Sequence, residues 1–93
     1  MTDPYGKFRA LLTDTYLFPA NYTHKFIGKN SDLFRNSVAE FEAKFVGLKR
    51  IGERRSANGN HLALTYDFLA GNVEDIVELA KATHAIDDLL YML

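Results

Sequence analysis

Basic residues gather in one short stretch of the 93-residue chain, from Lys49 to Arg55. Arg50, Arg54 and Arg55 could bind phosphate or carboxylate groups, because guanidinium groups contact both through paired hydrogen bonds. Charges of this kind are also typical of an exposed edge strand, where they prevent strand-to-strand aggregation. The stretch therefore allows two interpretations: an anion-binding surface or a solvated edge.

The three histidines do not form a metal-ligand pattern. His24, His61 and His84 are far apart in the sequence, and none has a second histidine or a carboxylate at ligand spacing. We interpret them as one half-buried and two exposed side chains. We therefore expect no metal ion and no cofactor.

The residue types of nucleophilic catalysis are present without their usual surroundings. The chain has no cysteine, and Ser31, Ser37 and Ser56 lack the sharp glycine-flanked turn that exposes a nucleophile. Asp87 and Asp88 are adjacent, but neighbouring residues of a strand point to opposite faces and cannot share a proton. We therefore expect that the protein is not an enzyme.

The composition is that of one small globular domain, with 47% hydrophobic and 25% charged residues. Eleven basic and twelve acidic residues give a net charge of −1, so no overall charge attracts nucleic acid or a membrane. No apolar run approaches the roughly 20 residues of a membrane span, and the N-terminus lacks the features of a secretory signal. We expect a cytoplasmic protein with no membrane partner.

The spacing of apolar residues predicts the secondary structure. Side chains alternate between residues 22 and 27, which indicates a strand. Apolar residues recur every three or four positions between 32 and 46, which indicates a helix with Ser31 as its N-cap. Asn58 and Gly59 predict a two-residue hairpin turn. The expected elements are a short N-terminal helix, strands near 21–28, 48–56, 60–68 and 86–92, and helices near 32–46 and 72–82.

After the N-terminal helix, these elements follow the order β-α-β-β-α-β of a ferredoxin-like fold. Right-handed crossovers place the first and third strands at the centre of a four-stranded antiparallel or mixed sheet, with both helices on one face. We predict an α+β sandwich in which residues 1–19 form a helical extension and residues 20–93 the ferredoxin-like domain. The other face of the sheet stays open.

A two-residue turn would place Arg54 opposite Ala63 and Arg50 opposite Asp67. The open face could then contact nucleic acid or an acidic protein. Exposed aromatic residues for base stacking are not predicted on the central strands, which disfavours nucleic acid. The predicted basic surface consists of Lys25, Arg50, Arg54, Arg55 and His61.

The last strand predicts a surface for self-association. One register places Leu90 and Met92 on the open face beside Ile27, with Tyr91 turned toward the helices. The opposite register would bury Asp88 without a partner, which is costly. An apolar patch of Ile27, Leu90 and Met92 would favour a weak homodimer.

Several short segments resemble one family when their order and spacing are taken together. They are Leu11-Leu12, Phe18-Pro19, Tyr22–Gly28, Ser56–Thr65 and Val73–Ile76. The chain resembles the YbeD-like bacterial proteins grouped as domain of unknown function 493, over about residues 11–93. The resemblance implies a ferredoxin-like fold similar to that of ACT regulatory domains and no established enzymatic activity.

ACT domains bind amino acids or similar small effectors near the loop between the first strand and helix. In this chain the loop comprises Gly28, Lys29, Asn30 and Ser31, so the resemblance implies a ligand site there. A glycine lets a ligand approach the backbone, and a helix N-terminus favours a carboxylate. We therefore expect a regulatory domain that binds a small-molecule effector or a protein partner.

Overall fold

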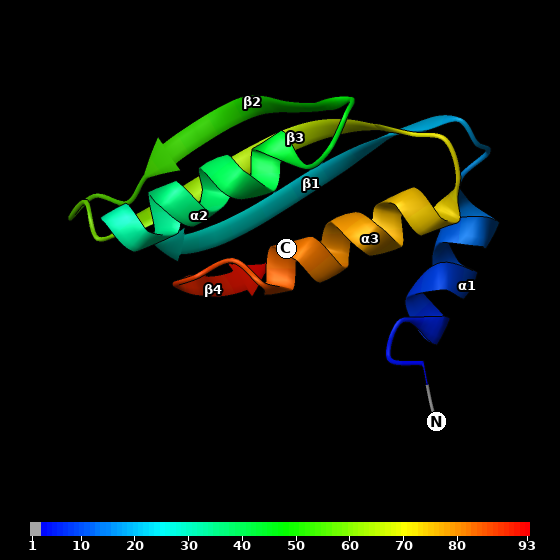
Figure 1. The fold of residues 1–93 in the computed structure, drawn as a ribbon, viewed down its shortest axis with the longest axis horizontal. Helices are drawn as coiled ribbons and strands as arrows, with labels where there is room; N and C mark the ends of the chain where they lie inside the picture. Colours follow the sequence, from blue (N-terminus) through cyan, green and yellow to red (C-terminus); the bar gives the residue numbers. More distant parts are fainter. Residues whose placement is uncertain (1–2) are drawn as a thin grey trace.

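The strands pair in the order 48–55, 61–70, 20–29 and 89–92, and every pairing is antiparallel. The computed structural model describes residues 3–93, and within them it contains three helices and four strands (Figure 1). Their bounds are α1 (Gly6–Thr15), β1 (Ala20–Lys29), α2 (Asp32–Ala43), β2 (Leu48–Arg55), β3 (His61–Ala70), α3 (Val73–His84) and β4 (Leu89–Met92). The predicted ferredoxin-like order is confirmed, with β1 and β3 at the centre.

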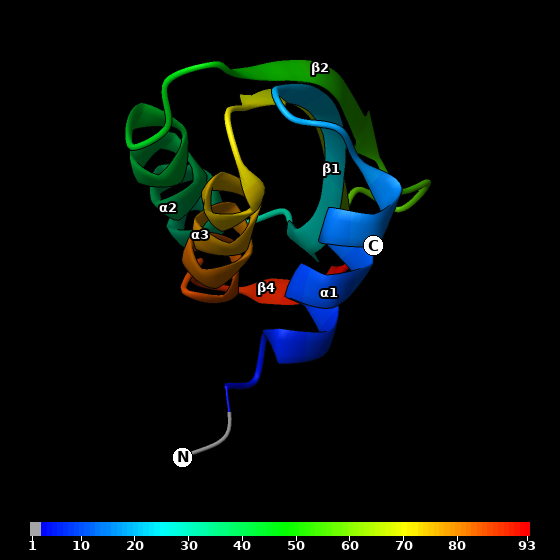
Figure 2. The ribbon, with the colours of Figure 1, turned by 90° about the vertical axis from the view of Figure 1, so that its right-hand side faces the viewer.

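Both helices of the predicted sandwich cover the same face of the sheet, as Figure 2 shows for α2 and α3. Ser31 caps α2, since its Oγ accepts a hydrogen bond from the Phe34 N–H at 3.1 Å. Helix α1 packs against α3 and adds Leu12 to the core. The first two residues of the predicted 1–19 extension lie outside the described residues. None of the helices within 3–93 is long and apolar enough to span a membrane.

The two central strands alternate as predicted. Phe26 of β1 and Leu64 of β3 are paired, and both are buried under the helices. Lys25 and Thr65 form the next pair and point to the open face. Because the two strands share ten paired positions without a shift, the sequence pattern holds along their full length.

The edge strand β2 departs from the predicted register. Arg54 lies opposite Ala63 as expected, but the register shifts between Arg50 and Gly52, which leaves Ile51 without a partner in the ladder. The prediction that Arg50 faces Asp67 on the open face is therefore wrong: Arg50 pairs with Tyr66 and lies on the helix side.

The remaining residues of the hairpin correct two more expectations. Arg55 pairs with buried Leu62, so its position in the register is on the helix side, although as the last residue of β2 it also lines a hollow of the open face. The turn spans four residues instead of two, since the Ser56 N–H donates to the His61 carbonyl at 3.0 Å. Within the turn Gly59 adopts a positive φ of 77° and Asn58 does not, so a type I′ turn does not form.

The short strand β4 carries the other shift. Met92 lies opposite Phe26 and Leu89 opposite Gly28, so both pack against the core. Tyr91 lies opposite Ile27 on the open face and is 57% exposed. The predictions that Met92 points to the open face and Tyr91 to the helices are therefore wrong. The shift lets both Leu89 and Met92 pack against the core, whereas strict alternation would turn one of them to the open face.

Candidate functional site

The loop between β1 and α2 is held by hydrogen bonds within the protein. The Asn30 N–H donates to the Asn60 carbonyl and its side-chain amide to the Gly59 carbonyl, both at 2.9 Å. The Ser31 hydroxyl donates to Asp88 at 2.7 Å while its oxygen caps α2. The loop's polar groups therefore join β1, the hairpin turn and the start of β4.

Gly28 has a packing role in this loop. A Cβ at this position would overlap the ring of Phe34, so the glycine allows α2 to approach β1 closely. The space that a ligand would need beside the glycine backbone is filled by the aromatic ring. The expectation that Gly28 opens the backbone to a ligand is wrong.

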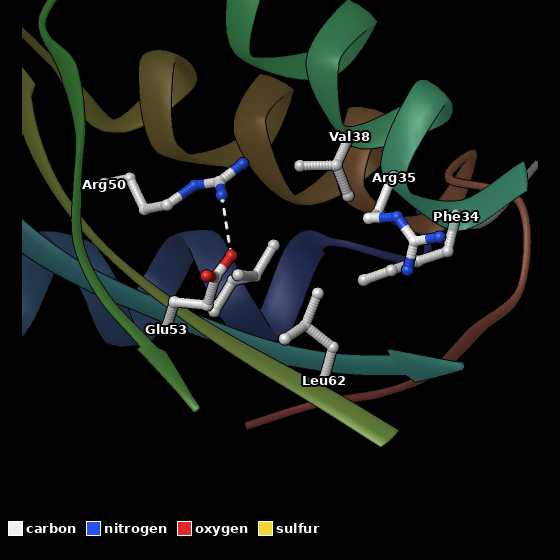
Figure 3. A pocket seen from close by; sticks show the side chains of 7 residues that line it. Phe34, Arg35, Val38, Arg50, Glu53 and Leu62 are labelled. Atoms are coloured by element: carbon white, nitrogen blue, oxygen red, sulfur yellow. Dashed lines mark hydrogen bonds and ion pairs between the residues drawn. The ribbon is translucent and has the colours of Figure 1, made fainter. Parts of the chain in front are cut away.

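A groove lies beside this loop, between α2 and the edge strand β2 (Figure 3). It consists of one cavity of about 230 Å³ and one of about 410 Å³, and Arg35, Glu53 and Leu62 line both. The first cavity is also lined by Phe34, Val38, Arg50 and Leu64, and the second by Asn30 and Arg55. We call these two cavities the α2–β2 groove.

The register shift in β2 creates the polar wall of the groove. Strict alternation would place Arg50 and Glu53, three residues apart, on opposite faces of the strand. Because Ile51 is left out of the ladder, both side chains point toward α2, as Figure 3 shows. They face the apolar side chains of Val38 and Leu62. The groove therefore combines an apolar floor with charged walls.

Arg50 is held inside a network at one end of the groove. Its guanidinium donates to Glu42 at 2.7 Å and to Glu53 at 3.0 Å. The Tyr66 hydroxyl donates to the same Glu42 carboxylate at 2.5 Å. Burial and then the Glu42 carboxylate raise the pKa of Tyr66, so this hydroxyl stays protonated. The network fixes Arg50 as part of the wall.

The other two arginines of the groove differ from each other in their partners. Arg35 donates to Asn30 and to Asp32, and its side chain is about half exposed. Arg55 forms no ion pair with any residue between 3 and 93. Both line the larger, polar cavity. This end of the groove can therefore accept an anion.

Of the predicted basic surface, Lys25, Arg54 and His61 lie together on the open face. Arg50 and Arg55 pair at helix-side positions and line the α2–β2 groove, so the predicted surface is divided between two sites. The sequence analysis did not predict that Tyr91 lies on the open face or that Arg35 lines the groove. Arg35 could have been found from its position one turn after Ser31, whereas no sequence signal indicates the shift that turns Tyr91 outward.

His24 is buried deeply, while His61 and His84 are exposed. The Thr83 hydroxyl donates to the Leu79 carbonyl, so it accepts the hydrogen bond from His24 Nε2, at 2.8 Å. Burial and then the charge of His84 lower the pKa of His24 to about 4. His24 is therefore neutral at pH 7. No group of three potential metal-ligating side chains occurs within the described part of the chain.

A family described as DUF493, protein of unknown function, matches residues 14–93, which include all four strands, α2 and α3. No curated protein and no solved structure matches the chain.

Proposed function

We propose that this chain, which belongs to the DUF493 family, is a non-catalytic regulatory domain that binds a small organic monocarboxylate in the α2–β2 groove. The proposal rests on one observation: the smaller cavity of the groove has an apolar floor, and the larger cavity beside it is lined by two arginines. Ligand sites in proteins commonly have this construction, an apolar lining with a few polar groups that fix orientation.

The lining residues support one orientation of the ligand. Its carboxylate would contact Arg55 and Arg35, since guanidinium groups bind carboxylates through paired hydrogen bonds. Its apolar body would lie on Val38 and Leu62 in the smaller cavity. Glu53 lines both cavities and would repel ligands with several negative charges, such as polyphosphates.

The site lies next to the loop that the ACT-like resemblance suggested. Asn30 belongs to both, because it lines the larger cavity and follows β1. A ligand in the groove would contact α2, the edge strand β2 and the β1–α2 loop together. Binding would therefore stabilise these elements relative to one another, which is a route to regulation.

A thermal shift experiment with a panel of aliphatic and aromatic monocarboxylates, each paired with its neutral amide, tests the proposal. A ligand at about 100 times its Kd adds about 2.7 kcal/mol to the free energy of unfolding. We expect this stabilisation for an acid and not for its amide.

Two neighbouring substitutions serve as test and control. Arg55→Gln should abolish the stabilisation, whereas Arg54→Gln, one residue away on the opposite face, should preserve it. A panel without any stabilising acid, or an equal loss in both variants, would contradict the groove as the ligand site.

A further inference from the structure

Charge is distributed unevenly between the sheet and the rest of the protein. Six of the eleven basic residues lie in strands, but only two of the twelve acidic residues, Glu53 and Asp67, do so. The strands are therefore positive and the helices and loops negative, although the whole chain has a net charge of only −1. The basic residues in the strands are Lys25, Lys29, Lys49, Arg50, Arg54 and Arg55.

Most of this positive charge lies on the open face. The pairing registers place Lys25, Lys29, Lys49 and Arg54 there, and Asp67 is the carboxylate that accompanies them within the described strands. None of these four cations forms an ion pair with a residue between 3 and 93. Their charges are therefore available to a partner.

One row of side chains crosses all four strands near the hairpin end of this face. Arg54 of β2 lies opposite Ala63 of β3, Ala63 opposite Ile27 of β1, and Ile27 opposite Tyr91 of β4. These four residues line a shallow hollow of about 260 Å³ together with Ser56, Arg55 and His61. The row runs from a cation through two apolar residues to an aromatic ring.

We propose that the open face binds an extended acidic segment of a partner protein. One apolar side chain of the segment lies over Ala63 and Ile27, against the exposed ring of Tyr91. Carboxylates on either side of it contact Arg54, Lys25 and the other unpaired cations. The positive charge of the face favours an acidic partner, and the apolar hollow fixes where along the face the segment binds.

Other occupants fit this face less well. A second copy placed face to face would bring the same unpaired cations together, which is unfavourable. A nucleic acid would need a stacking platform, and within the described strands Tyr91 and His61 are the aromatic rings on this face, both at its hairpin end. The register shift at Ile51 interrupts the free edge of β2, and the other edge strand, β4, has only four residues, so both edges are poor sites for adding a strand.

Fluorescence anisotropy with a labelled peptide of about eight residues tests the proposal. Such a peptide exceeds the roughly 14 Å that three interstrand spacings cover. Glutamates flank one central leucine. We expect binding that weakens as salt rises, and weaker binding when serine replaces the leucine. In an NMR titration of the wild-type protein, the amides of Lys25, Ile27, Ala63 and Tyr91 should shift.

A matched pair of double variants tests the role of the face. Lys25→Glu with Arg54→Glu should weaken peptide binding about 10-fold or more, because two attractive contacts become repulsive. Lys7→Glu with Lys44→Glu makes the same change in net charge away from the open face and should leave Kd within about 2-fold.

Three results would overturn the proposal. The first is an equal loss of binding in both double variants, or NMR shifts confined to the helices. The second is tighter binding of a labelled oligouridylate of equal length, which would assign the face to nucleic acid. The third is a wild-type dimer in sedimentation equilibrium that the Lys25→Glu and Arg54→Glu changes abolish, which would assign it to a second copy. Loss of the carboxylate effect in Arg55→Gln would leave this proposal unaffected, because the proposed contacts with the acidic segment are those of the four open-face cations, and Arg55 is not one of them.

Discussion

The two faces of the sheet differ in whether their polar side chains have partners within the protein. On the helix side, Tyr66, Glu42 and Arg50 form one hydrogen-bonded network, and His24 donates to Thr83 in the middle of the core. On the open face, the four cations form no ion pair with any residue from 3 to 93, and the row through Ile27 and Tyr91 is only partly covered. The helix side is built to hold the fold, and the open face is suited to contact something else.

The difference separates stability from binding. Substitutions on the helix side should change the free energy of unfolding, since they alter close packing or a buried polar group. Substitutions on the open face should change it little and should act on binding instead. Pairs of matched variants, one on each face of the sheet, allow these two kinds of effect to be compared directly.

The largest effect is expected from acidification, through His24. Its pKa is about 4 in the folded protein and near 6.5 in the unfolded chain. Between these values the unfolded chain binds a proton that the folded protein excludes, so the free energy of unfolding falls as pH decreases from 6.5 to about 4. The full loss is about 3 kcal/mol, and urea unfolding curves at several pH values measure it.

The variant His24→Gln provides the control for this titration. A glutamine amide can also donate to the Thr83 hydroxyl, but it does not titrate. Carboxylates elsewhere contribute equally to both proteins, so the difference between wild type and variant isolates His24. A difference that stays constant between pH 7 and 4 would contradict the neutral, buried histidine.

Two glycines on opposite faces give the next effect. Gly28→Ala places a Cβ against the Phe34 ring under the helices and should lower the free energy of unfolding by about 2 kcal/mol. Gly52→Ala, on the open face, brings its Cβ to 3.4 Å from the Thr65 Cβ and should change it by less than about 0.5 kcal/mol. If urea unfolding showed the same loss of unfolding free energy in both variants, the two faces would not differ in their contribution to stability.

Adjacent residues of β4 test the same contrast and the register shift. Met92→Ala removes a half-buried side chain that packs on the core and should lower the free energy of unfolding by about 2 kcal/mol. Tyr91→Ala removes an exposed ring and should lower it by less than about 1 kcal/mol. The reverse order in thermal or urea unfolding would restore the alternation that the sequence predicts.

Alternation and helical spacing were sufficient for β1, β3 and α2, because the faces of these elements follow from apolar spacing alone. They failed at Arg50, Tyr91 and Met92, because the alternation of β2 and of β4 is interrupted by a register shift in each strand. Such shifts arise from packing against α2 and the core, which a one-dimensional pattern does not contain.

The candidate sites were predicted only in part for the same reason. The loop with Asn30 was suggested by family resemblance, but the groove beside it depends on the shift at Ile51. Lys25, Arg54 and His61 were placed correctly on the open face because they lie in regular stretches of their strands. Tyr91 was not, because the register of β4 decides its direction.

The smallest effect concerns the unpaired cations themselves. Thr65 lies on the open face directly opposite Lys25. Thr65→Glu therefore places an anion beside Lys25, whereas Thr65→Lys places a fifth cation on this face. Opposite charges across a strand pair are favourable and like charges unfavourable, so the glutamate variant should be more stable by about 0.5 kcal/mol. Comparing two charged side chains of similar length removes most of the difference in strand propensity. The gap should shrink when salt shortens the Debye length from about 30 Å to about 3 Å, as urea unfolding at low and high salt would show. A lysine variant as stable as the glutamate variant would mean that this face has no excess of positive charge for an acidic partner to meet.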